Sequence, residues 1–181
     1  MPLLAKMASS LAQELLKRNN VYVENGHEPI PLLSEIGFTP KKMIFSCIDL
    51  RVKPEELLGL TDADEALVVR TASGTPARNL NDIVALDNLT TLTELIVIKH
   101  TDCGALHMTD EQIREHVRTH NPDIDDQVLN EVVVGTTHDI VERTRKDVEL
   151  IRNSPIIRKE LRETTSGLLI DITTGKLTKI V

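Results

Sequence analysis

Aromatic residues are scarce in this chain. It holds no tryptophan, one tyrosine and two phenylalanines, together 2 % of its 181 residues, whereas hydrophobic residues make up 40 %. A core built from this composition must be mainly aliphatic. The hydrophobic share and the 27 % of charged residues match an ordinary soluble globular protein. The length favours a single domain, residues 1–181.

Clusters of positive charge and long apolar runs are also missing. The chain has 21 Lys and Arg against 28 Asp and Glu, a formal charge of -7. Phosphate binding needs a clustered cationic face, so we expect no nucleic-acid partner. The first twenty residues lack the uninterrupted apolar stretch of a secretory signal, and no segment has the length of a membrane span. We therefore expect a cytoplasmic protein without a membrane partner.

The chain has only two cysteines, Cys47 and Cys103. Two thiols can form one disulfide, but a chain without a secretion signal normally works where thiols stay reduced. Neither cysteine belongs to a C-x-x-C pair, which disfavours a thiol–disulfide function. Both observations favour a metal-binding or catalytic role for the two cysteines.

The first segment has a helical pattern, because apolar residues recur at spacings of three and four. These residues are Leu3, Leu4, Met7, Leu11, Leu15 and Leu16. We predict a helical arm over residues 1–20, followed by a connecting loop to residue 40 that is rich in Gly and Pro. The apolar face of the arm packs either on its own domain, which is the simpler interpretation, or across a second subunit.

Residues 41–181 predict an α/β core. Four short apolar runs are typical of buried strands, and three helical patterns lie between them at 78–92, 110–120 and 138–154. The runs span residues 43–48, 66–71, 94–100 and 168–173. Alternating strands and helices indicate a mainly parallel central sheet flanked by helices. The turn-like TTGK at 173–176 predicts a C-terminal antiparallel hairpin with residues 177–181.

The stretch CIDLR at 47–51 places a thiol, a carboxylate and a guanidinium two residues apart. If the backbone stays extended beyond the strand, Cys47, Asp49 and Arg51 share one face. The planar fork of an arginine matches a carboxylate well and keeps it ionised and oriented. We therefore expect an Asp49–Arg51 pair beside the thiol.

The stretch HTDCG at 100–104 directly follows another predicted strand. In open α/β sheets the ligand crevice lies outside the carboxyl ends of the strands, so His100 and Cys103 can meet Cys47 there. Two sulfurs and one nitrogen suit zinc, and three protein ligands with one open position are typical of catalytic zinc. Asp49 as a fourth ligand remains an alternative, and it would make the site switch with pH.

Each motif has a simpler interpretation when it is taken alone. H-x-x-C occurs by accident, and a buried cysteine is usually a small apolar filler. Both motifs at strand ends, using both cysteines, favour the metal. His107 is a candidate proton shuttle, although a surface histidine is the simpler interpretation. The other helical histidines, His116, His120 and His138, are typical of solvated faces.

With these motifs the chain resembles a β-class carbonic anhydrase. That family carries Cys-x-Asp-x-Arg and His-x-x-Cys-Gly segments, and the similarity extends to ALVVRTASG (66–74) and GLLIDITTGKL (167–177). The resemblance implies one zinc ion per subunit held by Cys47, His100 and Cys103, with Asp49 and Arg51 as the catalytic dyad. The short length resembles the small clade D branch. Members are typically dimers or higher assemblies with an N-terminal helix on the partner, which implies a homodimer or homotetramer for this chain.

The resemblance implies reversible hydration of carbon dioxide to bicarbonate. Carbonyl sulfide hydrolases resemble the same branch, so hydrolysis of carbonyl sulfide to hydrogen sulfide and carbon dioxide is the alternative. A non-catalytic, zinc-stabilised oligomeric module is a third interpretation, which the presence of the dyad disfavours. We predict a pocket wall of Thr71, Ala72, Ser73, Gly74 and Gly104. Thr71 and Ser73 replace the usual asparagine and glycine, a change that bears on the substrate and not on the metal.

Overall fold

The computed structural model describes residues 2–32, 34–35 and 40–181. Contacts along the chain separate two units, residues 1–38 and residues 39–181. The prediction of a single domain stays a prediction, and the two units are described one at a time.

The first unit contains helix α1, Pro2–Glu24. The helix is longer than the predicted arm because no Gly or Pro lies between Pro2 and Gly26, whose left-handed φ of 99° ends it. Its leucines at positions 11, 15 and 16 are exposed. The side chains of Leu3, Leu4 and Met7 lie outside the described residues. None of the described helices combines the length and the apolar character of a membrane span.

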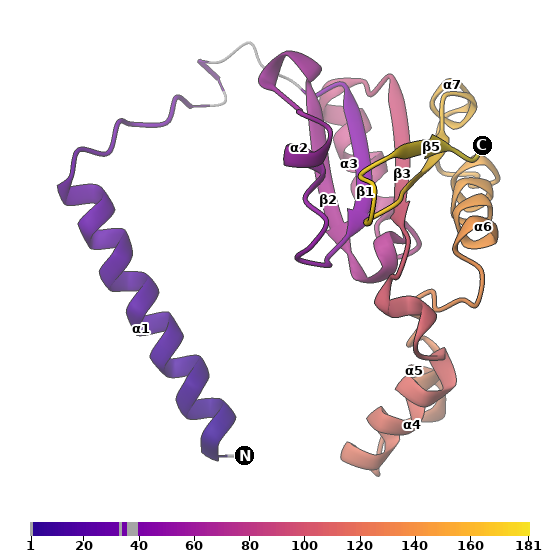
Figure 1. The fold of residues 1–181 in the computed structure, drawn as a ribbon, viewed down its shortest axis with the longest axis horizontal. Helices are drawn as coiled ribbons and strands as arrows, with labels where there is room; N and C mark the ends of the chain where they lie inside the picture. Colours follow the sequence, from indigo (N-terminus) through magenta and orange to yellow (C-terminus); the bar gives the residue numbers. More distant parts are fainter. Residues whose placement is uncertain (1, 33, 36–39) are drawn as a thin grey trace. The chain divides into compact units, whose positions relative to one another are not determined.

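The second unit is built on a five-stranded sheet in the order β2-β1-β3-β4-β5. The strands are β1 Lys42–Cys47, β2 Ala66–Thr71, β3 Glu94–His100, β4 Ser166–Ile170 and β5 Leu177–Lys179. The first four pair in parallel, and β5 runs antiparallel to β4. The predicted mainly parallel sheet and closing hairpin are confirmed (Figure 1).

Helices connect the strands, and some of them cover the sheet, whereas those at 110–120 and 126–130 extend away from it (Figure 1). The longer ones are α3 Leu80–Thr90, α4 Asp110–His120 and α6 Ile140–Arg152, at the positions the apolar periodicity predicts. The short helices α2 Pro54–Leu57, α5 Asp126–Asn130 and α7 Lys159–Glu163 were not predicted, because four or five residues are too few to show a helical period. Three 3₁₀ turns complete the unit: η1 Asp62–Asp64, η2 Ala72–Gly74 and η3 Gly104–Leu106.

The core is aliphatic, as the composition predicts. Successive side chains of β1 point to opposite faces of the sheet. Met43 and Phe45 pack in one cluster with residues of α3, α6 and α7, whereas Ile44 packs in a second cluster with Ile98 and Ile170. Phe45 is the aromatic member of the first cluster. Burial on both faces explains why β1 and β3 are continuous apolar runs instead of alternating ones.

A charged pair lies inside this core. The Lys99 ammonium at the end of β3 is 2.5 Å from Oδ2 of Asp147 on α6, and both side chains are almost fully buried. Burial lowers the pKa of Lys99, and the carboxylate opposes that effect. Oδ1 of Asp147 accepts hydrogen bonds from Thr75 and Arg143. The pair joins the sheet to α6, and each of its two charges would be buried without compensation if the other were removed.

We expect Asp147→Ala to lower the free energy of unfolding by about 3–5 kcal/mol, because it leaves the Lys99 charge buried without its partner. Chemical denaturation with urea measures this. Glu142→Ala is the matched control, since it removes a carboxylate of the same helix from an exposed pair with Lys146 and should cost about 0.5 kcal/mol or less. Equal effects of the two variants would contradict the assignment, whereas recovery in a Lys99→Met, Asp147→Leu double variant would support it.

Candidate metal centre and active site

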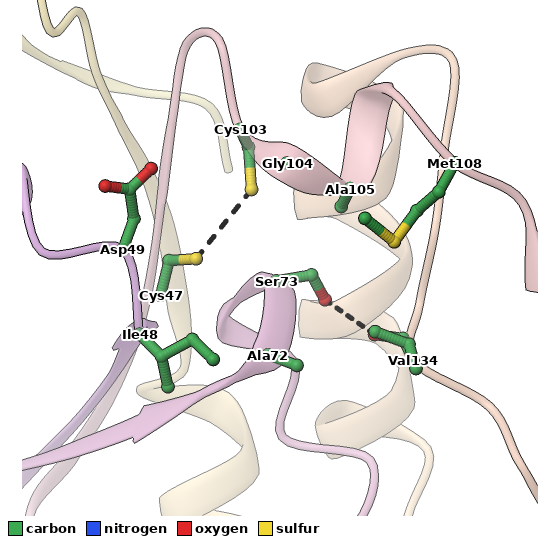
Figure 2. Close-up of a pocket in the computed structure, with 10 residues that line it drawn as sticks. All are labelled: Cys47, Ile48, Asp49, Ala72, Ser73, Cys103, Gly104, Ala105, Met108 and Val134. Atoms are coloured by element: carbon green, nitrogen blue, oxygen red, sulfur yellow. Dashed lines mark hydrogen bonds between the residues drawn. The ribbon is translucent and has the colours of Figure 1, made fainter. Parts of the chain in front are cut away.

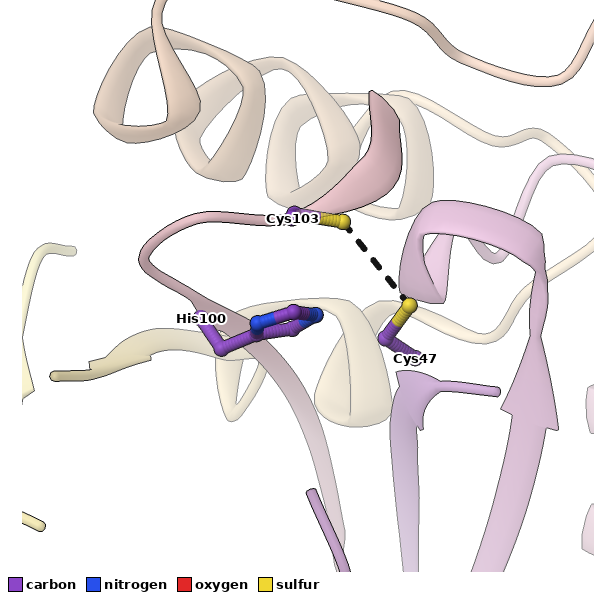
Figure 3. Close-up of side chains that lie close together, drawn as sticks. All are labelled: Cys47, His100 and Cys103. Atoms are coloured by element: carbon purple, nitrogen blue, oxygen red, sulfur yellow. Dashed lines mark hydrogen bonds between the residues drawn. The ribbon is translucent and has the colours of Figure 1, made fainter. Parts of the chain in front are cut away.

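Three ligand-type side chains converge at the carboxyl ends of the strands. Cys47 ends β1, His100 ends β3, and Cys103 follows the turn after β3. Their sulfur and ring nitrogen atoms all lie within 4.8 Å of one another, and all three residues are buried (Figure 3). The two Sγ atoms are 3.8 Å apart, and both cysteines are free thiols. The structure thus brings together the three residues that the sequence analysis predicts as zinc ligands.

The His100 ring is oriented for coordination. Its Nδ1 lies 2.9 Å from the Thr101 carbonyl oxygen, to which the N–H of this nitrogen donates. That hydrogen bond leaves the lone pair of Nε2 free. Nε2 is buried and has no hydrogen-bond partner among the described residues. A buried imidazole nitrogen without a partner, beside two thiols, fits a zinc ion, for which two sulfurs and one nitrogen are ordinary ligands.

The two thiols influence each other strongly. The hydrogen bond from Cys103 lowers the pKa of Cys47 to about 4, against the opposing effect of burial. The same bond raises the pKa of Cys103, since its proton is shared with the neighbouring thiolate. Burial lowers the pKa of His100, but the adjacent Cys47 thiolate outweighs burial and raises it. The cluster therefore favours one negative sulfur even before a cation binds.

Asp49 and Arg51 form the expected ion pair, but the predicted extended backbone is wrong. The chain turns after Asp49, where the Val52 N–H donates to the Asp49 carbonyl. The Asp49 carboxylate also accepts from the Arg51 backbone N–H at 2.9 Å. A carboxylate that bonds the backbone two residues on is typical of an aspartate-led turn. The turn, and not strand periodicity, brings the two side chains together.

The guanidinium holds the Asp49 carboxylate through two nitrogens. Arg51 Nε donates to Oδ1 at 3.1 Å and Nη2 donates to Oδ2 at 2.7 Å. This bond to Arg51 lowers the pKa of Asp49 to about 2, so the carboxylate is ionised at neutral pH. Oδ2 also lies 4.0 Å from Nε2 of His100. The carboxylate thus borders the cluster and is held from the opposite side by Arg51.

A second arginine fixes the backbone of this turn. Arg70, near the end of β2, donates from Nε to the Cys47 carbonyl at 3.1 Å. Its Nη2 donates to the carbonyls of Asp49 and Val52, at 2.6 and 2.8 Å. The sequence analysis missed this role, because nothing local to β2 indicates that a side chain reaches three carbonyls of the adjacent loop. Arg70 supports the metal cluster and the dyad without touching either side-chain group.

A pocket of about 220 Å³ opens beside the cluster (Figure 2). Ten residues line it: Cys47, Ile48, Asp49, Ala72, Ser73, Cys103, Gly104, Ala105, Met108 and Val134. Three of the predicted wall residues, Ala72, Ser73 and Gly104, are among them. Two are not: the Thr71 hydroxyl bonds the Thr75 carbonyl, and Gly74 packs against the end of β1. The wall is mainly apolar, and Met108 and Val134 come from segments that the sequence analysis did not assign to it.

The turn η2 forms one side of this pocket with strained backbone. Ser73 has a left-handed φ of 56°, which is unusual for a residue with a Cβ. Its hydroxyl donates to the Val134 carbonyl at 2.8 Å, and its own carbonyl accepts from buried Lys99 at 2.6 Å. Two contacts from distant parts of the chain therefore hold the turn in place.

The histidines differ in their surroundings. His107 is exposed, but its Nε2 lies 3.3 Å from Oδ1 of Asp102 near the dyad. His116, His120 and His138 are exposed, as predicted. Asp102 is the polar neighbour that the sequence analysis missed, although its place inside HTDCG is a signal that was available.

A family model described as carbonic anhydrase matches residues 42–177, three quarters of the chain and both motifs. The chain belongs to the β-class carbonic anhydrase family. The buried group of Cys47, His100 and Cys103 is consistent with the zinc site of that family.

Similar proteins have two different names. A carbon disulfide hydrolase of Acidianus sp. (strain A1-3) is 28 % identical over 160 residues, 75 % of each chain. A β-carbonic anhydrase 1 of Mycobacterium tuberculosis is 25 % identical, covering 94 % of this chain and 98 % of its own. Among solved structures, a carbonic anhydrase from Glaciozyma antarctica is 29 % identical with a TM-score of 0.68, covering 91 % of this chain and 95 % of its own.

We expect Gly74→Ala to perturb the metal centre. Gly74 has a φ of +67°, and an added Cβ would lie 3.0 Å from the Cys47 backbone nitrogen, which has little freedom to move. The left-handed backbone alone costs a side chain about 1–2 kcal/mol, so the free energy of unfolding should fall by more than that. Urea denaturation and the zinc content of the purified variant measure the two effects.

Gly59→Ala is the matched control for this change. Gly59 has a similar φ of +61°, but an added Cβ would meet nothing within 4 Å. The control should lose only the backbone term of about 1–2 kcal/mol and keep its zinc. If both variants lose the same stability and both keep zinc, the close approach of Gly74 to Cys47 is unimportant.

Proposed function

We propose that this protein is a zinc enzyme that hydrates carbon dioxide reversibly to bicarbonate. One arrangement carries the proposal: the Cys47, His100 and Cys103 cluster opens toward a pocket that also contains the ionised Asp49 carboxylate. A structural metal site has no need of a carboxylate that an arginine holds at its open side. The resemblance to clade D stays a prediction within this proposal.

In this proposal Cys47, His100 and Cys103 hold the zinc ion. When bound, the ion supplies a Lewis acid that makes a hydroxide nucleophile available near neutral pH. The free lone pair of His100 Nε2 and the low pKa of Cys47 support these roles, since both atoms are ready to bind a cation.

Asp49 would orient the attacking oxygen. An ionised carboxylate only accepts hydrogen bonds, so the nucleophile must donate its hydrogen to Oδ2 and present a lone pair to the substrate carbon. Arg51 binds the same carboxylate through Nε and Nη2 and so prevents it from rotating. This pairing supports Asp49 as an acceptor and disfavours it as a fourth metal ligand.

The reaction joins the water oxygen to the carbon of carbon dioxide while one C=O double bond becomes a single bond to an anionic oxygen. Water gives up one proton, which must reach the solvent buffer before the next cycle. The apolar wall, with Ile48, Ala105 and Met108, suits a linear apolar molecule.

Hydrolysis of carbonyl sulfide or carbon disulfide is the second candidate. The same nucleophile would attack carbon, and carbonyl sulfide with one water would give carbon dioxide and one hydrogen sulfide. Carbon disulfide would need two waters, the first giving carbonyl sulfide and hydrogen sulfide and the second giving carbon dioxide and another hydrogen sulfide. The aliphatic pocket wall favours this alternative, because sulfur is larger and a poorer hydrogen-bond acceptor than oxygen. Relatives named carbon disulfide hydrolases give it further support.

We also infer that the chain self-associates as a homodimer or homotetramer. The exposed leucines of α1, at positions 11, 15 and 16, support this inference because an apolar helix face normally packs against something. Sedimentation equilibrium of the purified chain measures the assembly, and a monomer at micromolar concentration would contradict it.

We expect the purified protein to contain one zinc ion per chain. Both thiols should be protected from a thiol reagent until a chelator removes the metal, because thiolates that bind zinc are poor nucleophiles. Atomic emission and a thiol titration measure the two quantities. Cys103→Ala should lose the zinc. Protein that is free of metal yet fully active would rule out a zinc enzyme, and a Cys47–Cys103 disulfide would favour a redox function.

The decisive test compares three substrates on the same zinc-loaded preparation. Stopped-flow pH change follows hydration of carbon dioxide, and sulfide release follows carbonyl sulfide and carbon disulfide. Fast hydration with slow sulfide release supports the carbonic anhydrase. The reverse result assigns the sulfur substrate, and no turnover of any of the three contradicts both candidates.

Asp49→Ala should lower kcat/KM on the preferred substrate by about 100-fold or more, as expected when the group that orients the nucleophile is lost. Zinc content should not change. Asp123→Ala is the control, since it removes an exposed carboxylate between α4 and α5. Unchanged turnover in Asp49→Ala would contradict the dyad mechanism.

A further inference from the structure

We propose that Asp102 is a positioning residue that holds the Arg51 guanidinium in the orientation in which it grips Asp49. This inference rests on the proposed function of the dyad, and it adds a third residue to it. The argument uses the contacts of Arg51, the way Asp102 is itself fixed, and the exposure of both.

Arg51 is bound from two sides. One side faces Asp49, through Nε and Nη2. On the other side, Nη1 donates to the Asp102 carboxylate at 2.8 Å and Nη2 donates to the Asp102 backbone carbonyl at 2.9 Å. All three guanidinium nitrogens therefore have partners, and Asp102 supplies two of the bonds. Without them the guanidinium would be held from one side only.

Exposure makes this second attachment important. The Arg51 side chain is 52 % exposed, whereas that of Asp49 is 18 % exposed. A half-exposed arginine has many rotamers, so packing alone does not fix its position. Contacts on both sides of the planar fork restrict it to one orientation, and that orientation aims the Asp49 carboxylate at the pocket.

Asp102 is well placed to act as a fixed anchor. It lies between His100 and Cys103, in a left-handed conformation with φ 52° that aspartate tolerates better than most residues. The preceding residue, Thr101, donates its backbone N–H to the last carbonyl of β4, and its hydroxyl accepts from the Ile172 N–H just after that strand. The turn that carries His100 and Cys103 thus also carries the anchor of Arg51, so one turn positions both the cluster and the dyad.

The remaining oxygen of Asp102 faces His107. Its Oδ1 lies 3.3 Å from Nε2 of His107, and both side chains are more than half exposed. Hydrogen bonds from Arg51 and then His107 lower the pKa of Asp102, so the carboxylate is ionised at neutral pH. The longer, exposed contact to His107 is weaker than the two bonds to Arg51. His107 therefore supports the anchor but is not needed for it.

A purely structural role predicts a different outcome from a positioning role. An ion pair between half-exposed groups contributes little to stability, so loss of the Asp102 charge should hardly change the melting temperature. A positioning residue loses activity instead, because misplacement of an oriented group slows the chemical step. Stability and turnover must therefore be measured on the same variant.

The variant for the test is Asp102→Asn. Asparagine keeps the size of the side chain and accepts left-handed backbone, so the change removes the charge and one acceptor oxygen. We expect kcat on the preferred substrate to fall about tenfold, in the range typical of groups that orient active-site residues. KM and zinc content should change by less than a factor of two, and the melting temperature should stay within about 2 °C.

A readout besides activity reports on Arg51 directly. The Arg51 Nε–H should give a resolved, slowly exchanging signal in the ¹H–¹⁵N spectrum of the protein, and Asp102→Asn should broaden it or raise its exchange rate. Asp126→Asn is the matched control, because Asp126 pairs with Arg118 at 3.0 Å on the exposed face of α4 and α5. The control should change neither turnover nor the Arg51 signal.

Three results would overturn the proposal. Wild-type kcat in Asp102→Asn is one, and lost kcat with an unchanged Arg51 signal is another. The third is an equal loss in His107→Ala, which would place the effect on His107. If Asp49→Ala itself leaves turnover unchanged, the proposed function of the dyad fails, but the Arg51 signal still decides whether Asp102 holds the guanidinium.

Discussion

The parallel pairing of β1 with β3 is the constraint on which the site depends. Phe45 stands opposite Val97, so the carboxyl ends of both strands reach the same edge of the sheet. Cys47 and His100 are the last residues of these strands. An antiparallel pairing of the same two strands would separate the two side chains by roughly 20 Å, the length of one strand. The cluster is thus a consequence of topology before any ligand chemistry is considered.

The buried ion pair of Lys99 and Asp147 supports one wall of the pocket. The period of two sends Lys99 and His100 to opposite faces of β3, so His100 joins the cluster while Lys99 reaches Asp147 on α6. Lys99 also donates to the Ser73 carbonyl and thereby holds the left-handed turn of η2. A buried ion pair is seldom a net gain in stability over apolar packing. Here it fixes the shape of a pocket wall, which an aliphatic side chain without a donor could not do.

The sequence was sufficient for the strands, the longer helices and the metal cluster. Each depends on a local signal, such as the run ELIVIKH or the pair of motifs around Cys47 and Cys103. The ion pair of Asp49 and Arg51 was also predicted, but for the wrong reason, because a turn replaces the assumed extended backbone. A short loop after a strand has no periodicity from which its conformation can be read.

What the sequence did not predict depends on contacts between distant segments. Val134 reaches the pocket from the segment between α5 and α6, and Met108 from the segment before α4. Arg70 reaches the loop after β1 from the neighbouring strand. No local sequence pattern indicates these contacts, which form only in the folded tertiary structure. Asp102 is different, because its motif was quoted but its side chain was not given a role.

The same reasoning locates substrate choice outside the motifs. In the proposed mechanism the cluster and the Asp49–Arg51 pair prepare the same nucleophile whether the substrate carbon carries oxygen or sulfur. Among the described residues that line the pocket, the Ser73 hydroxyl is already used by the Val134 carbonyl, and Asp49 only accepts hydrogen bonds. No side-chain donor of this wall is therefore free to recognise an oxygen end of the substrate. In the proposed function, discrimination between linear molecules of the same shape would then rest on size and dispersion, and among the residues outside both motifs Met108 and Val134 contribute to it.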